Sequence, residues 1–175
     1  MLEQGLILIR QATAEDALQL VEAEKEIAQE AGYFCSQPSE LNERDTRQTI
    51  ESSQGIYLVA EKKGSLVGHA FLEVLGLKSL CHVAQLNIVV HKGYQGHGIG
   101  TLLMKELIKW AKQSETVEKI ELSVRTCNLR AIALYKKMGF YEEGCLKRRV
   151  KVGNSYFDDI LMALHIKGEG DEFPN

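Results

Sequence analysis

Residues 89–101 have the sequence Val89-Val90-His91-Lys92-Gly93-Tyr94-Gln95-Gly96-His97-Gly98-Ile99-Gly100-Thr101. Just before this stretch, apolar and polar residues alternate from Ala84 to Val90, which predicts a β-strand with one apolar face. After Gly98 the period changes to the 3.6 residues of an amphipathic helix. The apolar face of that helix is expected to comprise Ile99, Leu102, Leu103, Leu107, Trp110 and Ala111. A strand therefore leads into a helix through a cluster of glycines.

The region before this stretch is predicted to hold a strand, two helices and a hairpin. Thr13 is a candidate N-cap of the first helix, with Asp16 three residues later. The turn of the hairpin is expected at Lys62-Lys63-Gly64. The expected elements are a strand at 6–10, a helix from Thr13 to near Gly32, a second helix from Pro38 to about Ser53, and strands at 56–60 and 66–74.

The region after the stretch is predicted to contain a strand, a helix and a closing hairpin. The strand covers Ile120–Val124, and the helix covers Asn128–Met138 with Gly139 as its C′ residue. Two more strands between Phe140 and Ile166 are joined by the turn dipeptide Gly153-Asn154. This order predicts an α/β (α+β) fold with a mixed, mostly antiparallel sheet that carries helices on its faces.

Composition indicates a single folded domain. The chain has 175 residues, of which 45% are hydrophobic and 26% are charged, and it contains only 2 prolines. These fractions are those of a globular protein and exclude disordered and low-complexity classes. We expect one domain over residues 1–166, followed by a polar tail at 167–175.

The charge balance gives no reason to expect nucleic acid or a membrane as a partner. Lys and Arg total 21 against 24 Asp and Glu, for a formal net charge of -3. The apolar runs are strand-sized and fall short of the roughly 20 residues that cross a bilayer. A basic cluster at 147–151 is explained by a solvated strand face.

Cysteine spacing and the start of the chain favour a cytoplasmic protein. The four cysteines lie tens of residues apart without a CxxC or Cys/His cluster, so we expect reduced thiols and no metal site. Residues 1–4 lack the basic and apolar regions of a secretory signal. The cysteines are Cys35, Cys81, Cys127 and Cys145.

The glycine-rich stretch predicts a cradle for a phosphate or pyrophosphate. Glycines allow backbone N–H groups to turn toward a ligand, and a helix N-terminus favours an anion. A P-loop is excluded because the stretch lacks its Lys. A dinucleotide-binding GxGxxG motif fits poorly, because Thr101 stands at the last glycine position and the stretch follows an antiparallel meander. An NAD-dependent oxidoreductase is therefore a weak alternative.

Two motifs together resemble the GNAT superfamily of acetyl-CoA-dependent N-acetyltransferases. The first is Gln95-x-x-Gly98-x-Gly100, which resembles the pyrophosphate loop of that family. The second runs from Asn128 through Leu134-Tyr135 to Gly139-Phe140, with the family's order and spacing. The resemblance covers roughly residues 6–166. It implies a sheet of about seven strands flanked by about four helices.

The resemblance implies a role for each residue that matches a motif. Backbone N–H groups of the glycine loop would bind the pyrophosphate of coenzyme A, and the end of the preceding strand would meet its pantetheine arm. Asn128 would bind the arm, and Tyr135 would act as the general acid for the leaving thiolate. The implied cofactor-binding residues are Ile88, Val89, Val90, Gln95, Gly96, His97, Gly98, Ile99, Gly100, Thr101, Asn128 and Tyr135.

The resemblance also implies direct transfer of acetyl from acetyl-CoA, as co-substrate, to a primary amine in a ternary complex. The acceptor stays open between a small amine or polyamine and a peptide or protein α-amine. Candidate general bases are Glu26, Glu73 and His82, besides a water chain. A protein that binds acyl-CoA as a sensor without catalysis is the main alternative. The oligomeric state is open, although the final hairpin is a common dimer contact in the family.

The segment between the first two helices is expected to lie over the acceptor site. Tyr33-Phe34-Cys35 and Leu41-Asn42 would shape a substrate pocket there, or would pack between the helices instead. The ending around Tyr156 and Asp158 resembles the closing hairpin of the ribosomal-protein and spermidine branches of the family.

Overall fold

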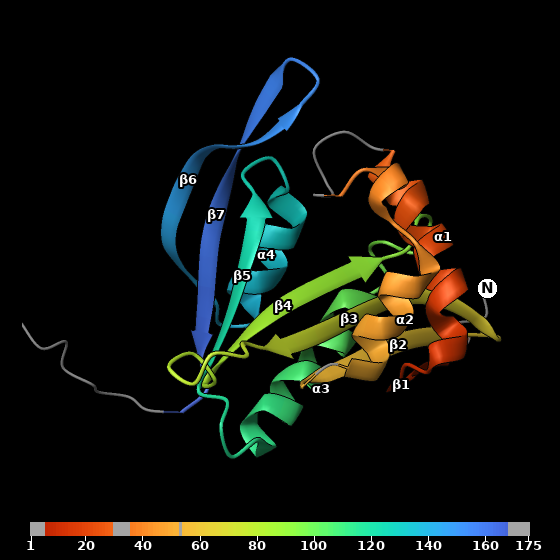
Figure 1. The fold of residues 1–175 in the computed structure, drawn as a ribbon, viewed down its shortest axis with the longest axis horizontal. Helices are drawn as coiled ribbons and strands as arrows, with labels where there is room; N and C mark the ends of the chain where they lie inside the picture. Colours follow the sequence, from red (N-terminus) through yellow and green to blue (C-terminus); the bar gives the residue numbers. More distant parts are fainter. Residues whose placement is uncertain (1–5, 30–35, 53, 168–175) are drawn as a thin grey trace, which may run out of the picture.

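The protein, seen in a computed structural model, is organised around a mixed seven-stranded sheet with the order β1-β2-β3-β4-β5-β7-β6 (Figure 1). The structure describes residues 6–29, 36–52 and 54–167. Neighbouring strands are antiparallel except β4 and β5, which are parallel. The strands are β1 (Ile7–Gln11), β2 (Ile56–Lys62), β3 (Ser65–Val74), β4 (Val83–Val90), β5 (Lys119–Arg125), β6 (Tyr141–Val152) and β7 (Ser155–His165).

Helices cover both faces of this sheet. Helices α1 and α2 lie on one face, and α3 and α4 pack on the other (Figure 1). The α-helices are α1 (Ala17–Ala28), α2 (Glu43–Ser52), α3 (Ile99–Gln113) and α4 (Leu129–Lys137), with short 3₁₀ turns η1 (Ala14–Asp16) and η2 (Pro38–Glu40). The predicted fold class, with its mostly antiparallel sheet, is confirmed.

Helix α3 fills the larger of the two cores. Leu103, Met104 and Leu107 are almost completely buried against the strands, as the 3.6-residue period requires. The predicted apolar face was wrong at one position, since Leu102 is 38% exposed. Met104 is buried instead, so the buried face of α3 is rotated about the helix axis relative to the predicted face.

The first helical region differs from the predictions at its boundaries. Helix α1 ends at Ala28, and residues 30–35, which include Tyr33-Phe34-Cys35, lie outside the described residues. The predicted helix from Pro38 to Ser53 is wrong as one element, because Leu41 is extended with ψ 123° and separates η2 from α2. Asn42 then caps the new start, and its Oδ1 accepts a hydrogen bond from Asp45 N at 3.0 Å.

The strands β4 and β5 part along the sheet. Only Val83–Gln85 pair with Lys119–Glu121, and the two strands then diverge toward their carboxyl ends (Figure 1). The antiparallel pairs on either side continue, because β3 pairs with β4 up to Val90 and β7 pairs with β5 up to Arg125. The sheet is thus split into two halves at one end.

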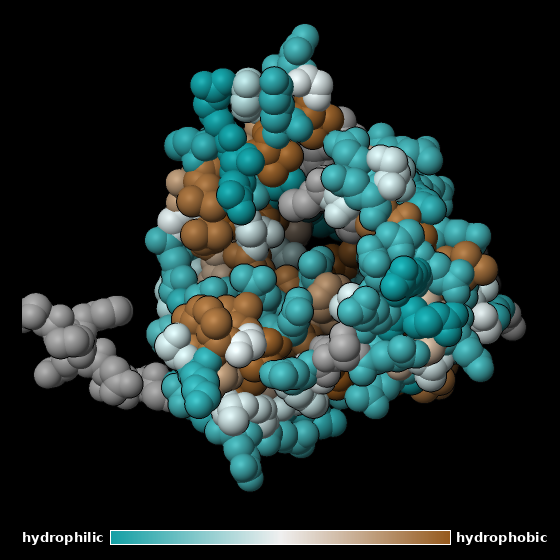
Figure 2. Space-filling model, in the orientation of Figure 1, coloured by the Kyte–Doolittle hydropathy of each residue, from teal (hydrophilic) through white to brown (hydrophobic). Residues whose placement is uncertain are grey.

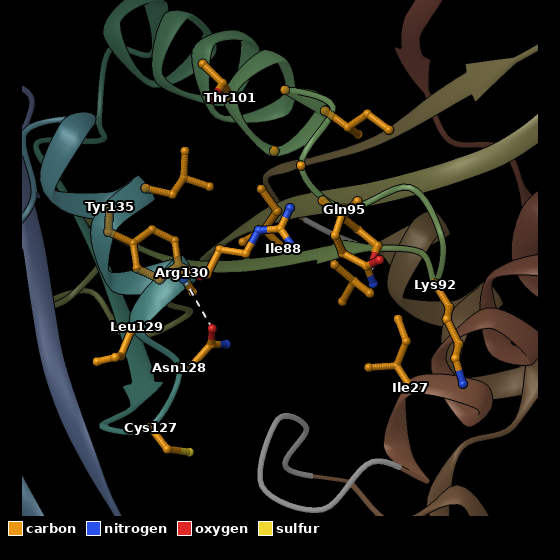
Figure 3. Close-up of a pocket in the computed structure, with 18 residues that line it drawn as sticks. Ile27, Ile88, Lys92, Gln95, Thr101, Cys127, Asn128, Leu129, Arg130 and Tyr135 are labelled. Atoms are coloured by element: carbon orange, nitrogen blue, oxygen red, sulfur yellow. Dashed lines mark hydrogen bonds between the residues drawn. The ribbon is translucent and has the colours of Figure 1, made fainter. Parts of the chain in front are cut away.

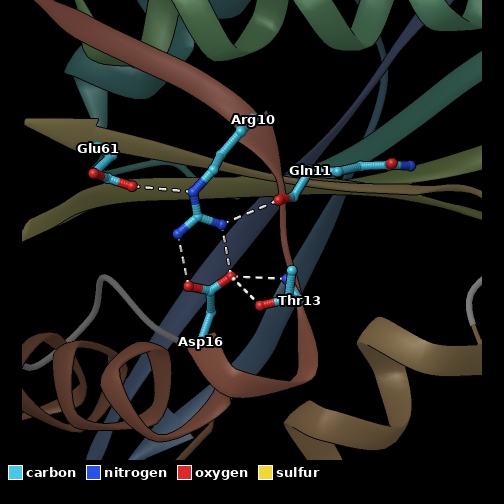
Figure 4. A network of polar contacts seen from close by, with 5 residues as sticks. All are labelled: Arg10, Gln11, Thr13, Asp16 and Glu61. Atoms are coloured by element: carbon cyan, nitrogen blue, oxygen red, sulfur yellow. Dashed lines mark hydrogen bonds and ion pairs between the residues drawn. The ribbon is translucent and has the colours of Figure 1, made fainter. Parts of the chain in front are cut away.

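A polar network fixes the entry to α1, as Figure 4 shows. Both terminal guanidinium nitrogens of Arg10 donate to the carboxylate of Asp16 at 2.8 Å, and its Nε donates to Glu61 Oε2 at 3.0 Å. The backbone N–H of Thr13 donates to Asp16 Oδ2 at 2.7 Å. The predicted N-cap Thr13 thus caps η1, the turn that leads into α1, whereas Asp16 is the N-cap of α1 itself. Arg10 also fastens this start to β1 and β2.

Within the described ranges, no helix is long and apolar enough to span a membrane.

We expect Asp16→Asn to lower the free energy of unfolding at pH 7 by about 1–3 kcal/mol, because it breaks a nearly buried charged hydrogen-bond network. The Arg10 guanidinium lowers the pKa of Asp16, so this stabilisation is present above the pKa of an unfolded Asp, about 3.9. It is lost as pH falls through the lower folded pKa. Denaturant titrations of both proteins at several pH values check this, and the difference between them is expected to shrink as pH falls below about 4.

The matched control is Glu61→Gln, which removes the single, more exposed contact of Arg10. We expect it to cost less than about 1 kcal/mol. Equal losses for the two variants would contradict the central place of Asp16 in the network.

Candidate active site

A cavity of about 920 Å³ opens where β4 and β5 have parted. Figure 2 shows the hollow near the middle of this face, between the α1–α2 side and the β6–β7 side. Its walls come from the end of β4, the loop into α3, the first turn of α3, the segment 127–135, and Ile27 of α1 (Figure 3). Segments far apart in the sequence therefore share one site.

The structure brings the predicted site residues together with one exception. His97 does not line the cavity, and its Nδ1 lies 3.2 Å from the carbonyl oxygen of Tyr94. The predicted residues that line the cavity are Ile88, Val89, Val90, Gln95, Gly96, Gly98, Ile99, Gly100, Thr101, Asn128 and Tyr135.

The side chain of Gln95 fixes the glycine loop to the end of β4. Its Oε1 accepts from Gly93 N at 3.0 Å, and its Nε2 donates to Val90 O at 3.2 Å. Gly98 follows with φ +80°, a left-handed conformation that favours glycine, and acts as the N-cap of α3. The first intrahelical bond is donated by Leu102 N to Gly98 O at 3.1 Å, so the N–H groups of Ile99–Thr101 precede it.

Gly100 allows α3 to pack closely against α4 and β4. A Cβ at this position would lie 3.0 Å from Leu134 Cδ2 and 3.7 Å from Val90 Cγ2. The absent side chain thus keeps the N-terminus of α3 at the floor of the cavity. Together with Gly98 it forms a concave surface of backbone N–H groups, which suits an anion.

The start of α4 adds an amide and a positive charge to this surface. Asn128 is the N-cap of α4, and its Oδ1 accepts from Ala131 N at 3.2 Å, while Figure 3 shows its amide nitrogen directed toward the middle of the cavity. Arg130 crosses to the glycine loop, where its Nη2 lies 2.9 Å from the position of a Cβ on Gly96. Arg130 is not among the residues predicted from the sequence, although it lies inside the Asn128 motif, because the spacing of a motif does not show how far a side chain reaches across a cavity.

Tyr135 lies on the cavity side of α4 with its ring pointing inward (Figure 3). The residue is 7% exposed, and its ring centroid lies 5.9 Å from that of Phe140. Burial raises the pKa of Tyr135 to about 12. The phenol therefore keeps its proton at neutral pH and can donate it.

None of the three predicted base candidates lines the cavity. Glu26 lies on the exposed side of α1, with Oε1 4.0 Å from Lys92 Nζ. Glu73 is exposed near the end of β3, where it pairs in register with Gln85, away from the cavity end of β4. His82 precedes β4, which runs for eight residues before it reaches Val90. The structure supports none of these side chains as a direct base.

Among the residues that the structure describes, no group of three or more His, Cys, Asp or Glu side chains could hold a metal ion. The described cysteines Cys81, Cys127 and Cys145 are exposed and free of disulfides.

Comparison with known proteins agrees with this geometry. The sequence profile of the Acetyltransferase (GNAT) family matches residues 19–140. The L-amino acid N-acetyltransferase AaaT of Escherichia coli K12 is 31% identical over 160 residues, which cover 90% of this chain and 96% of that protein.

Two solved structures share the fold. An acetyltransferase of the GNAT family from Streptococcus pneumoniae superposes with a TM-score of 0.86 at 28% identity, over 93% of this chain and 100% of that one. The yncA protein of Salmonella typhimurium, solved with its cofactor acetyl-CoA, has a TM-score of 0.87 at 18% identity, over 96% and 98% of the two chains. The sequence profile match and the relatives lead to one conclusion: this chain belongs to the GNAT family of acetyl-CoA-dependent N-acetyltransferases.

Proposed function

We propose that this protein transfers acetyl from acetyl-CoA to the α-amine of a free amino acid or short peptide, by direct attack in a ternary complex. One observation carries the proposal. A single cavity brings together the N-terminus of α3, the unpaired end of β4, Asn128 and Tyr135. The similarity to the L-amino acid N-acetyltransferase AaaT, of which 96% is covered by the match, favours an amino acid over a polyamine as acceptor.

The cavity residues fit coenzyme A in charge and in shape. The N–H groups at the start of α3 suit the pyrophosphate, and the guanidinium of Arg130 beside Gly96 adds a full positive charge. A Cβ on Gly98 would meet no atom within 4 Å, so the loop leaves open space on that side. The end of β4 from Leu86 to Val90 has no pairing with β5, and its backbone can bind the pantetheine amides as a further strand would.

The reaction needs one proton removed from the acceptor and one supplied to the leaving group. A neutral amine forms the new C–N bond at the thioester carbonyl carbon, the C–S bond breaks, and the sulfur leaves as a thiolate. Tyr135 donates its phenolic proton to that thiolate and regains one from solvent. The proton lost by the nitrogen passes to water, because the predicted carboxylate and imidazole bases lie outside the cavity.

The cytoplasmic location, and a homodimer through the β6–β7 hairpin, remain predictions of the sequence and of the family resemblance.

We expect Gly98→Glu to abolish acetyl-CoA binding. The new side chain places a carboxylate at the anion cradle and forces a left-handed conformation on a non-glycine residue. Isothermal titration with acetyl-CoA measures the loss. Gly64→Glu is the matched control, because Gly64 has φ +79° and equal open space but lies in the β2–β3 turn. Unchanged affinity in Gly98→Glu would disprove the placement of the pyrophosphate.

We expect Tyr135→Phe to lower kcat by about 10²–10⁴-fold while the Kd for acetyl-CoA changes less than about threefold, because only proton donation is lost. Steady-state kinetics and calorimetry separate the two quantities. Tyr141→Phe serves as the control, since Tyr141 is exposed and lies on β6, outside the cavity. Parallel losses of turnover and affinity would show that Tyr135 is structural.

An acceptor panel tests the substrate class. We expect free amino acids or short peptides to be acetylated with kcat/KM at least about tenfold above spermidine, as measured by thiol release from acetyl-CoA. A preference for spermidine would overturn the α-amine assignment. Tight acetyl-CoA binding with no transfer to any amine would favour the sensor instead.

A further inference from the structure

A chain of three buried polar side chains connects α1 to the sheet behind the cavity. His69 Nε2 lies 2.9 Å from Glu24 Oε1, and His69 Nδ1 lies 3.1 Å from His91 Nε2. His91 Nδ1 ends the chain 3.0 Å from the carbonyl oxygen of Leu66. Glu24, His69 and His91 are 9%, 1% and 6% exposed, so these contacts are almost completely shielded from water.

The contacts of this polar chain determine how many protons Glu24, His69 and His91 hold together. The carbonyl of Leu66 can only accept, so His91 Nδ1 carries a proton. If His91 is neutral, its Nε2 is an acceptor and the proton between the two rings belongs to His69 Nδ1. The contact between His69 Nε2 and Glu24 then needs one more proton, held either by the carboxyl or by an imidazolium. Ionised Glu24 beside two neutral histidines would leave one of the three contacts without a hydrogen.

The surroundings place this extra proton at the Glu24 end. Burial, followed by the charge of His69, lowers the pKa of His91 to about 4, so His91 stays neutral near pH 7. From β2, Tyr57 stacks on His69 at 6.0 Å, and burial together with Glu24 and Asp16 raises the pKa of Tyr57, so it too is neutral. The proton therefore belongs to the pair of Glu24 and His69.

Other titratable groups near the chain are already paired. Asp16 of η1 is held by Arg10. Lys92, which follows His91, lies 4.0 Å from Glu26 on the outer side of α1.

Residues next to this polar chain, in sequence or in strand register, line the cavity. Ile27 lies one turn beyond Glu24 on α1 and lines the cavity. Val89 is the register partner of His69 and also lines the cavity. Val90 and Lys92, the neighbours of His91, do so as well. The polar chain is thus a fastening between α1 and the end of β4, behind the cavity.

We infer that Glu24, His69 and His91 are positioning residues for acetyl transfer, which hold helix α1 and Ile27 against the end of β4. Glu24 and His69 share the extra proton that completes the three contacts. This inference rests on the proposed function. Glu24 and His69 keep the extra proton during turnover, because losing it breaks a buried hydrogen bond. Glu24 is consequently not the base that deprotonates the acceptor.

Glu24→Gln separates positioning from proton transfer. A Gln amide can donate to His69 Nε2, so all three contacts persist without the extra proton. We expect kcat and the acceptor KM at pH 7 to stay within about threefold of the wild type. Glu24→Met, of similar length but without a donor, should raise the acceptor KM by at least about tenfold and lower Tm by about 3–10 °C. Glu26→Gln, an exposed change on the same helix, should alter neither.

Histidine ring NMR of the wild type tests the proton count even if Glu24→Met fails to fold. We expect protons on Nδ1 of both His69 and His91 and an unprotonated His91 Nε2 at pH 7. A His91 imidazolium, or a loss of kcat in Glu24→Gln as large as in Glu24→Met, would overturn the inference. The NMR, Tm and acetyl-CoA affinity do not depend on turnover. A wild type that acetylates no amine but gives the expected spectra would therefore refute the proposed function alone.

Discussion

The divergence of two parallel strands is the constraint on which the rest of this structure depends. After three paired positions, β4 leaves β5, and the backbone from Leu86 onward loses its partner on that edge. A sheet cannot leave buried N–H and C=O groups without partners at low cost. The opening therefore needs either solvent or a ligand with amides of its own. In the proposed function the pantetheine arm of acetyl-CoA meets this need, which links the topology of the sheet to the reaction.

Three local features keep this opening in place. Gln95 binds the glycine loop to the last carbonyl of β4. The missing side chain of Gly100 lets α3 approach Leu134, and Asn128 starts α4 at the opposite wall. Because these contacts come from successive elements of a strand–helix–strand–helix unit, the anion cradle and the phenol of Tyr135 are positioned by the same packing.

The wall formed by α1, which the proposed function assigns to the acceptor, is built differently. There α1 is fastened by polar contacts, at its start through Arg10 and Asp16 and in its middle through Glu24 and His69. Buried ionisable groups contribute little net stability, but each must keep its partner, so they restrict the geometry of the elements that carry them. These contacts restrict the position of α1 against the sheet, and a substrate pocket needs a wall in a defined position. Under the proposed function, the hydrophobic packing of α3 serves the co-substrate and the polar contacts of α1 serve the acceptor.

Much of this was determined by the sequence alone. The change from a period of two to 3.6 residues across residues 84–111 defines a strand, a turn and a helix by local sterics and burial, and the structure confirms all three. The glycine loop and the Asn128 segment likewise predicted the residues of one cavity, because each motif depends on backbone conformation within a few residues. His97 is the exception, since loop curvature decides which side chains face inward.

Only the tertiary structure decided which distant side chains meet. Arg130 reaches Gly96 across the cavity, and Glu24, His69 and His91 join from three elements that are separated by 45 and 22 residues along the chain. No periodicity encodes such contacts, because the sequence around a buried polar residue does not show which distant side chain is its partner. The base candidates Glu26, Glu73 and His82 do not line the cavity, which the sequence pattern around them did not reveal. The residue types alone determine which side chains can bind an anion or transfer a proton, whereas sheet register and helix placement decide which of them share a site.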